Sequence, residues 1–492
     1  MSKIKKVVSL VTSLAMAGAV TAGLTGCGDS KGEDTLLWYV FGDKPADLDT
    51  VLAKANEIIE PEIGMKLDMQ YIDSASYTSK MKNIMAAHEK YDLAFTGFVN
   101  PYQEAVALGG LYDITDLVKE TGLDKEMPDF YLDSASVDGR IYGIPNVQVV
   151  SNPVSICMDK SLAEEIGVDM KAIEDAAQNA KNFEDVKAYS VLLDDLFAKV
   201  HAARPDLYVM NPTYDLLIDP FYEQVVSETY IRKDGSSDEI VIDMETEEGK
   251  FSAEKLNEWF NKGYIRNDIS STGTAVASNE EWRKIAVRST TWKPGQDAYD
   301  VERYGEEQVY AKLCKPYVGR TSALATMTSV GADSKHPKEA VELLKLMNTN
   351  KELFNIICWG IEGTHYTVAD NGHIAEVENS GYNGIGQNAW RFGNQFNALL
   401  LENQEDDTWE KTEQMNNDAI KSKMLGFVPN TDVITNELAN ITNVADEYKA
   451  KREFGTIEVS KWDKEYADKL DKAGIHKVRD ELQKQYDEFL NK

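Results

Sequence analysis

Hydrophobic and polar positions alternate between two patterns in the first hundred residues. Unbroken or alternating apolar runs predict strands, and apolar residues at three- and four-residue spacing predict amphipathic helices. The chain should leave the first helix at Pro61 and Gly64, which break helical structure. A β-α-β-α-β order predicts right-handed crossovers and a parallel sheet, with ligands bound beyond the carboxyl ends of the strands. The five segments, in chain order, are 36–41, 46–60, 66–72, 77–89 and 92–96.

Two extended stretches, near 145–157 and 316–330, predict that the chain passes between two lobes through a hinge. Helical patterns occupy most of 160–203 and most of the chain after residue 390. The predicted fold class is therefore α/β, with two lobes joined by a hinge of several strands and a helical C-terminal region. The expected division is 1–26 signal peptide, 27–34 tether, 35–145 and 316–355 lobe 1, and 146–315 and 356–492 lobe 2 including a helical extension.

The N-terminus carries an export signal. Three lysines precede an apolar run of 14 residues at 7–20, which is shorter than the roughly 20 residues that a membrane-spanning helix needs. The sequence Leu-Thr-Gly-Cys then ends at Cys27 and is similar to a bacterial lipobox, in which the cysteine is lipidated after cleavage. We therefore expect a body attached through Cys27 to the extracellular face of the cytoplasmic membrane. An ordinary cleaved signal with an incidental cysteine is the alternative.

The acidic composition narrows the choice of ligands and partners. The chain has 492 residues, with 83 acidic and 52 basic side chains and a net charge of −31. Such a surface repels phosphate backbones, so a nucleic-acid partner is not expected. After Cys27, three cysteines remain in apolar or mixed segments, and buried free thiols are the expected state. Six scattered histidines form no metal-binding motif, so neither a metal nor a cofactor is predicted.

Three further segments carry a family resemblance. Residues 109–117, 138–145 and 334–340 resemble, in this order, motifs of bacterial extracellular solute-binding proteins of ABC importers, family 1, carbohydrate type. Residues 359–366 are similar to a segment of LplA/LipO-type lipoproteins, which carry an extra C-terminal domain of unknown function. The resemblance covers residues 35–492 and implies the type II periplasmic-binding-protein fold. It also implies a carbohydrate ligand, probably an oligosaccharide, the transmembrane permease subunits of an ABC importer as partners, and a monomer.

A carbohydrate site needs flat aromatic faces for stacking and polar side chains for the hydroxyl groups. Aromatic and polar residues in predicted loops are the candidates, although for each tryptophan packing in the core is an equal or stronger alternative. Trp38, Trp259 and Trp462 lie within predicted strands or helices and are interpreted as core residues. The expected ligand-binding residues are Asp43, Asn100, Asn146, Gln148, Trp292, Trp359, Glu362, His365, Tyr366 and Trp390.

Other functions remain open at this point. A surface glycosidase needs two carboxylates flanking the scissile bond, and nothing in the sequence singles out such a pair. The motifs of serine hydrolases, P-loop proteins and zinc proteases are absent, so an enzyme is not expected. A peptide- or cation-binding lipoprotein, or a surface scaffold, is the second alternative.

Overall fold

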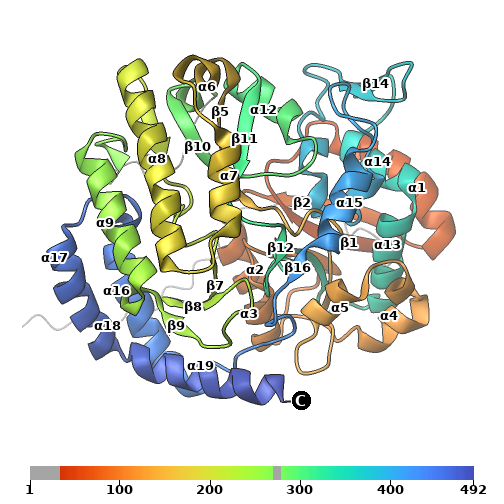
Figure 1. The fold of residues 1–492 in the computed structure, drawn as a ribbon. Helices are drawn as coiled ribbons and strands as arrows, with labels where there is room; N and C mark the ends of the chain where they lie inside the picture. Colours follow the sequence, from red (N-terminus) through yellow and green to blue (C-terminus); the bar gives the residue numbers. More distant parts are fainter. Residues whose placement is uncertain (1–33, 270–278, 492) are drawn as a thin grey trace, which may run out of the picture.

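Two separate β-sheets, each covered by helices, divide the chain into two lobes, as the computed structural model shows for residues 34–269 and 279–491 (Figure 1). The first sheet has the strand order β2-β1-β3-β13-β4. The first three of these strands are parallel, while β13 runs antiparallel to β3 and to β4. The predicted parallel β-α-β-α-β unit is thereby confirmed. The bounds are β1 Thr35–Phe41, α1 Leu48–Ile63, β2 Lys66–Ile72, α2 Tyr77–Ala86, β3 Leu93–Gly97, β4 Gly143–Pro145 and β13 Thr326–Val330.

Helix α1 ends three residues later than predicted, at Ile63 instead of residue 60. Pro61 lies inside the helix, which continues to Ile63 and is closed by Gly64 in the left-handed conformation. A proline lacks only its own N–H donor, so in the last turn it removes a single helical hydrogen bond. The amide of Gly64 then donates to the carbonyl of Glu60 at 2.9 Å and completes the turn.

The second sheet has the order β11-β5-β10-β6 and forms the core of the second lobe. Helices α7 and α8 run side by side over it (Figure 1) and bury an apolar stripe against the strands. Trp259 on α9 is fully buried in this core, as expected. The bounds are β5 Val154–Asp159, α6 Lys160–Ile166, α7 Met170–Asn179, α8 Phe183–Ala203, β6 Tyr208–Asn211, α9 Glu247–Asn261, α11 Asn279–Trp282, β10 Ile285–Thr291, α12 Gln296–Tyr304 and β11 Gln308–Lys312.

The C-terminal helices share a core with one side of the second lobe. Trp462, Val478 and Leu482 are fully buried against a small sheet of order β7-β8-β9. Arg452 reaches from α16 to the buried carboxylates of Asp243 and Glu228. The bounds are β7 Tyr222–Val226, β8 Thr229–Arg232, β9 Val241–Ile242, α16 Thr435–Glu453, α17 Val459–Lys461, a π-helical turn Trp462–Tyr466, α18 Ala467–Ala473 and α19 Ile475–Leu490.

The chain crosses between the lobes at 146–153, at 313–325 and again near residue 420. The last two crossings pair as a short parallel ladder of β12 and β16. Residues 356–419 pack in the core of the first lobe, so the assignment of this stretch to lobe 2 is wrong. The reason is that α14 lies against α1 and α13 and carries the following loops with it. The bounds are β12 Tyr317–Val318, α13 Pro337–Thr349, α14 Lys351–Trp359, β14 Tyr366–Val368, β15 Ile374–Glu376, α15 Thr408–Asp418 and β16 Ile420–Lys421.

Several short helices complete the first lobe. Within the described residues, no helix is long and apolar enough to cross a membrane. The bounds are α3 Tyr102–Ala107, α4 Thr115–Thr121, α5 Asp129–Ala135 and the 3₁₀ turns Leu123–Lys125, Gly386–Arg391 and Gln395–Asn397, with two further 3₁₀ turns at Asp243–Glu245 and Asp432–Ile434 in the second lobe and C-terminal part.

Candidate functional site

Four aromatic rings form a surface at the carboxyl ends of β1 and β3. The ring of Trp390 lies 6.0 Å from Phe41, 6.3 Å from Phe95 and 5.9 Å from Phe98, measured between ring centroids. Phe98 is 60% exposed, although large apolar side chains are usually buried in a soluble protein. We call these four rings the aromatic surface. Phe41 and Phe95 are buried and form its base, whereas the exposed Phe98 and the half-buried Trp390 could present ring faces for a sugar to stack on.

Arg391 holds the aromatic surface to the end of β1. Its Nη1 donates to the carbonyl of Phe41 at 2.8 Å, and its guanidinium lies 5.4 Å from the Phe41 ring and 5.9 Å from Trp390. Burial lowers the pKa of Arg391 below its usual range. Gly42, with φ of +120°, lets the backbone pass this side chain, because a Cβ there would lie 3.1 Å from Nη1.

Predicted polar residues line the neighbouring strand ends. The buried side chain of Asn100 donates to the carbonyl of Phe95 at 3.4 Å, and its backbone carbonyl accepts from Gly97. Thr326 lies opposite Gly97 in the ladder and accepts a 2.8 Å hydrogen bond from Gln148.

Two more predicted residues belong to the same end of the sheet. The backbone amide of Asn146 donates to the carbonyl of Thr326, while its buried side-chain Nδ2 has no hydrogen-bond partner among the residues that the structure describes. A buried donor without a partner is costly, which makes Asn146 a candidate for a ligand hydroxyl. Asp43 follows β1 and is exposed. The structure therefore brings Asp43, Asn100, Asn146, Gln148 and Trp390 to one end of the first sheet.

Trp292 lies elsewhere, in a cavity of about 880 Å³ between the second lobe and the segment 403–420. The Nζ of Lys312 stands 4.5 Å from the centroid of the Trp292 ring. Burial, assisted by the charge of Glu405, raises the pKa of Asp297. We call this space the Trp292 cavity. Its other polar lining side chains include Glu174, Gln178, Lys315, Asn403, Gln404, Lys411 and Gln414.

Contacts between the lobes close one end of the Trp292 cavity. Gln404 donates to the hydroxyl of Tyr299 at 3.2 Å, and Asn403 donates to the carbonyl of Ala298 at 3.2 Å. Since residues 356–419 pack on the first lobe, both hydrogen bonds join the two lobes. A ligand in this cavity would thus touch both lobes at once.

Three of the predicted ligand-binding residues are buried and are not accessible to a ligand. Trp359 is 4% exposed and packs in the first core, where its ring lies so close to Gly386 that a Cβ there would overlap it. His365 is buried, accepts from the amide of Ile361 at 2.9 Å and lies 3.3 Å from a carboxylate oxygen of Asp47. Tyr366 is also buried. These residues support the fold, because the glycine-rich segment after α14 turns inward.

Glu362 is exposed and belongs to the same turn as Tyr366, with which it forms an isolated bridge. Among the described residues, no contact joins Glu362 to the aromatic surface. Cys27 lies outside the described residues. The other three cysteines are free and buried, as expected.

Sequence reasoning missed four contributors to the site: Phe41, Phe95, Phe98 and Arg391. Phe98 was detectable, since it directly follows the predicted strand end at Gly97. Arg391 gave no such signal, because its partner Phe41 is 350 residues away along the chain.

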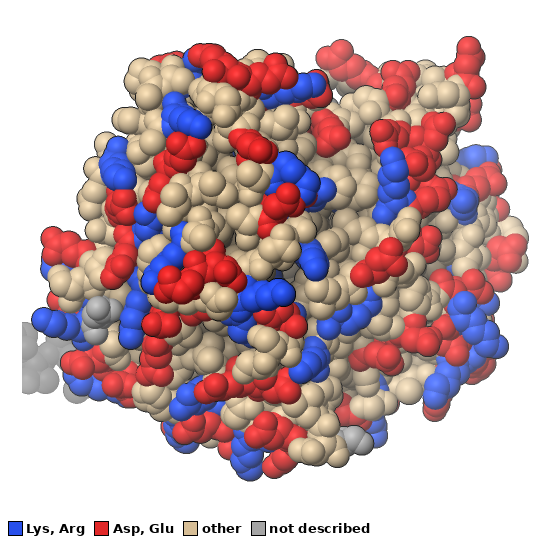
Figure 2. Space-filling model, in the orientation of Figure 1, with Lys and Arg blue, Asp and Glu red and all other residues tan. Residues whose placement is uncertain are grey.

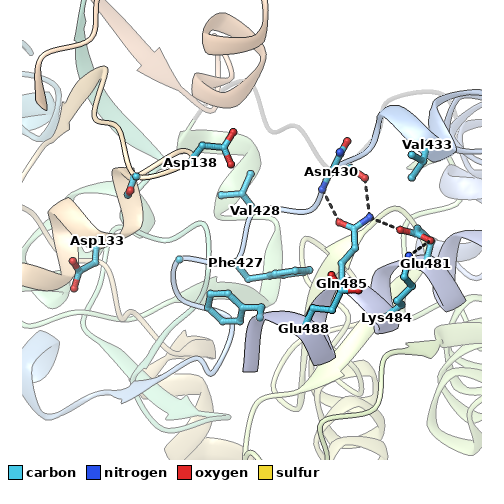
Figure 3. Close-up of a pocket in the computed structure, with 14 residues that line it drawn as sticks. Asp133, Asp138, Phe427, Val428, Asn430, Val433, Glu481, Lys484, Gln485 and Glu488 are labelled. Atoms are coloured by element: carbon cyan, nitrogen blue, oxygen red, sulfur yellow. Dashed lines mark hydrogen bonds and ion pairs between the residues drawn. The ribbon is translucent and has the colours of Figure 1, made fainter. Parts of the chain in front are cut away.

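A second large space lies between the first lobe and the C-terminal helices (Figure 3). This groove of about 620 Å³ has Asp133 and Asp138 on one wall and α19 on the other. Gln485 points toward Asn430 and holds its backbone by two hydrogen bonds of 2.7 and 3.0 Å. None of the predicted ligand-binding residues lines this groove. Across the described residues, no group of three His, Cys, Asp or Glu side chains could hold a metal ion.

Comparisons with known proteins give three similarities. Residues 423–491 match the family model "Domain of unknown function (DUF3502)". Over 500 aligned residues the chain is 27% identical to a carbohydrate ABC transporter substrate-binding protein of Streptococcus pneumoniae serotype 4, covering 98% of this chain and 96% of that protein.

Comparison with solved structures also gives a solute-binding protein, in agreement with the sequence comparison. The crystal structure of the N-glycan transport solute-binding protein NgtS from Streptococcus pneumoniae superposes with a TM-score of 0.80 at 25% identity, over 93% of this chain and 99% of that one. Its complex with Man1GlcNAc gives a TM-score of 0.74 at 26% identity, over 93% and 100% of the two chains. The resemblance to solute-binding proteins of ABC importers and the predicted fold class are confirmed, including the extra C-terminal domain of unknown function.

Proposed function

We propose that this chain is the substrate-binding protein of an ABC importer and that it binds an oligosaccharide between its two lobes. The observation that carries the proposal is similarity along 98% of the chain to a carbohydrate substrate-binding protein. NgtS, the structural relative, has been crystallised with Man1GlcNAc and with Man5GlcNAc. Mannose- and N-acetylglucosamine-containing oligosaccharides are therefore the first ligands to test.

Two parts of the molecule supply what such a ligand needs. In the aromatic surface, Phe98 and Trp390 offer ring faces for the apolar side of a sugar, and Asn146 offers a side-chain amide nitrogen that has no partner among the described residues for a hydroxyl. The Trp292 cavity offers another ring, surrounded by carboxylates, amides and lysines. We propose Asp43, Asn100, Asn146, Gln148, Trp292 and Trp390 as ligand-binding residues.

Binding would act through the hinge. A ligand held by one lobe gains contacts with the other only when the lobes close, so it shifts the equilibrium by its differential affinity. Moving a population from 1:99 to 99:1 requires about 5.5 kcal/mol. A micromolar site provides roughly 8.2 kcal/mol in total, which is enough to drive closure. The transmembrane permease would then recognise the closed form of the monomer, held at the membrane by a lipid on Cys27.

Isothermal titration calorimetry with Man5GlcNAc and related glycans tests the proposal. We expect saturable binding, a glycan that is recovered chemically intact, and about five- to 150-fold weaker binding for Trp292→Ala, the effect of losing one stacked ring. Trp409→Ala is the matched control, since Trp409 is also half-buried but its indole donates to the carbonyl of Ala398 and does not line the Trp292 cavity.

Three other outcomes would contradict the proposal or the assigned residue. Binding of peptides or cations with silence across glycans would replace the carbohydrate proposal by the peptide- or cation-binding alternative. Consumption of the glycan during incubation would indicate a glycosidase. Equal losses for Trp292→Ala and Trp409→Ala would remove Trp292 from the site.

A further inference from the structure

A cluster of cations stands out on a molecule whose net charge is −31. Blue side chains gather near the centre of the face in Figure 2, over the region where Figure 1 labels β12 and β16. Two small pockets of about 180 and 190 Å³ open there. They adjoin, because five residues line both, namely Arg232, Lys233, Asp234, Tyr317 and Ile420.

Nearly all of the charged side chains that line these two pockets are cationic. Six basic side chains line them, against the single carboxylate of Asp234. Concave sites lined by one sign of charge concentrate counter-ions, even when the rest of the surface repels them. We call this feature the hinge cation cluster, and its members are Lys181, Arg232, Lys233, Lys315, Lys421 and Lys423.

Only two of the six basic side chains form ion pairs among the described residues. Arg232 pairs with Asp234 and Glu248, and Lys423 pairs with Asp238 at 2.7 Å. The remaining four lysines of the cluster have no carboxylate oxygen within 4.0 Å in the part of the chain that the structure describes: Lys181, Lys233, Lys315 and Lys421.

Neutral contacts position two of the four. The Nζ of Lys233 donates to the carbonyl of Asp219 at 2.5 Å and lies 5.4 Å from the ring centroid of Tyr317. The Nζ of Lys421 donates to the carbonyls of Asn416, Asn417 and Ala419 at 2.5, 3.3 and 3.4 Å. Burial lowers its pKa, while Asp418 acts against that shift. Lys181 and Lys315 are exposed at the mouth and free to reorient.

We propose that the hinge cation cluster binds a small, multiply charged oxyanion, such as a phosphate or sulfate group. Each pocket is too small for a sugar chain but large enough for one tetrahedral group. Ammonium groups form strong charge-assisted hydrogen bonds to phosphate oxygens. Lysines come here from the second lobe (Lys181, Lys233) and from the crossing segments (Lys315, Lys421), so a bound oxyanion joins the hinge to that lobe.

The hinge cation cluster adjoins the Trp292 cavity, because Lys315 lines both, but oxyanion binding to it needs no glycan. Calorimetric titration of the purified chain with sodium phosphate, and separately with sodium sulfate, at constant ionic strength set with sodium chloride, tests it directly. We expect saturable binding that is about tenfold weaker in Lys181→Gln/Lys315→Gln. Both side chains are exposed, so this variant should fold. A triple variant that adds Lys233→Gln should show no saturable binding.

Lys119→Gln/Lys125→Gln is the matched control, because both lysines are exposed and carry no ion pair in the described part of the chain. It removes the same net charge and should leave phosphate affinity unchanged. Titration with glucose 6-phosphate distinguishes a free oxyanion from the phosphate group of a sugar phosphate as the ligand. Affinity equal to that for inorganic phosphate indicates that only the phosphate group is recognised. Tighter binding indicates that the ligand is a phosphorylated sugar. Absence of saturable binding to either inorganic anion, or an equal loss in the control, would overturn the proposal.

Discussion

Replacing Arg452 by methionine should loosen the C-terminal helices from the second lobe. The guanidinium contacts Asp243 directly and lies 3.6 Å from a carboxylate oxygen of Glu228, and these two side chains are only 2% and 11% exposed. It also lies 5.1 Å from the centroid of the Trp462 ring. Burial alone would lower the pKa of Arg452, yet the charge of Glu228 raises it above the usual range.

The magnitude follows from what the substitution leaves behind. Methionine keeps the packing of the long side chain, but two carboxylates remain buried without their cation. Removing one partner of a buried ion pair destabilises a protein by roughly 3–5 kcal/mol, mostly through the unpaired charge. An exposed pair is worth about 0–1 kcal/mol. The matched control is therefore Arg204→Met, which breaks the exposed pair of Arg204 with Glu165.

Urea denaturation followed by circular dichroism measures the difference. We expect a loss of roughly 3–5 kcal/mol for Arg452→Met and at most about 1 kcal/mol for Arg204→Met. Adding Glu228→Gln to Arg452→Met should restore part of the loss, because one stranded charge disappears. If Arg452→Met were no more destabilised than Arg204→Met, the reasoning that this ion pair holds the C-terminal helices in place would be refuted.

Two further predictions concern the first lobe, and a third concerns the carboxyl group of Asp219. Trp359→Ala should destabilise the chain by about 3–5 kcal/mol in urea denaturation, because the ring is core, and glycan affinity of the folded protein should stay near wild type. Gly97→Ala should lower the thermal midpoint, since a Cβ would lie 2.1 Å from the carbonyl oxygen of Ala325 at a φ of +137°; Gly139→Ala, at positive φ in open space, is the control and should lose less. Burial and the neighbouring Asp215 raise the pKa of Asp219 to about 6, above its usual 3.8, so the folded state binds the proton more tightly. Stability should then fall as pH rises from about 4 to 6, and Asp219→Asn should flatten this part of a pH-stability curve.

The local pattern of the sequence determined the first lobe well. The strand at 66–72 has the predicted bounds, and β1 is one residue longer than its apolar run. Trp38 is core, as its place inside that run indicated. Period-two and period-3.6 patterns reflect burial on one face of an element, so they can be detected within a few residues of chain.

The site was only partly predictable for the same reason. Asp43 and Asn100 follow strands, and all parallel strands end at one edge of a sheet, so their approach could be expected. By contrast, Trp359, His365 and Tyr366 have the composition of a binding loop, but the turn after α14 points them into the core. Sequence composition does not state the direction in which a glycine-rich segment turns.

Contacts between distant segments were decided by the tertiary structure alone. Residues 356–419 return to the first lobe because α14 packs on α1, and this single packing choice brings Trp390 and Arg391 to the end of β1. The same applies to the hinge cation cluster, whose lysines come from four separate segments of an acidic chain. The sequence by itself determined the elements, their order and the class of fold, since these depend on neighbouring residues. Which distant side chains share a surface depends on long-range packing, and that only the folded chain decides.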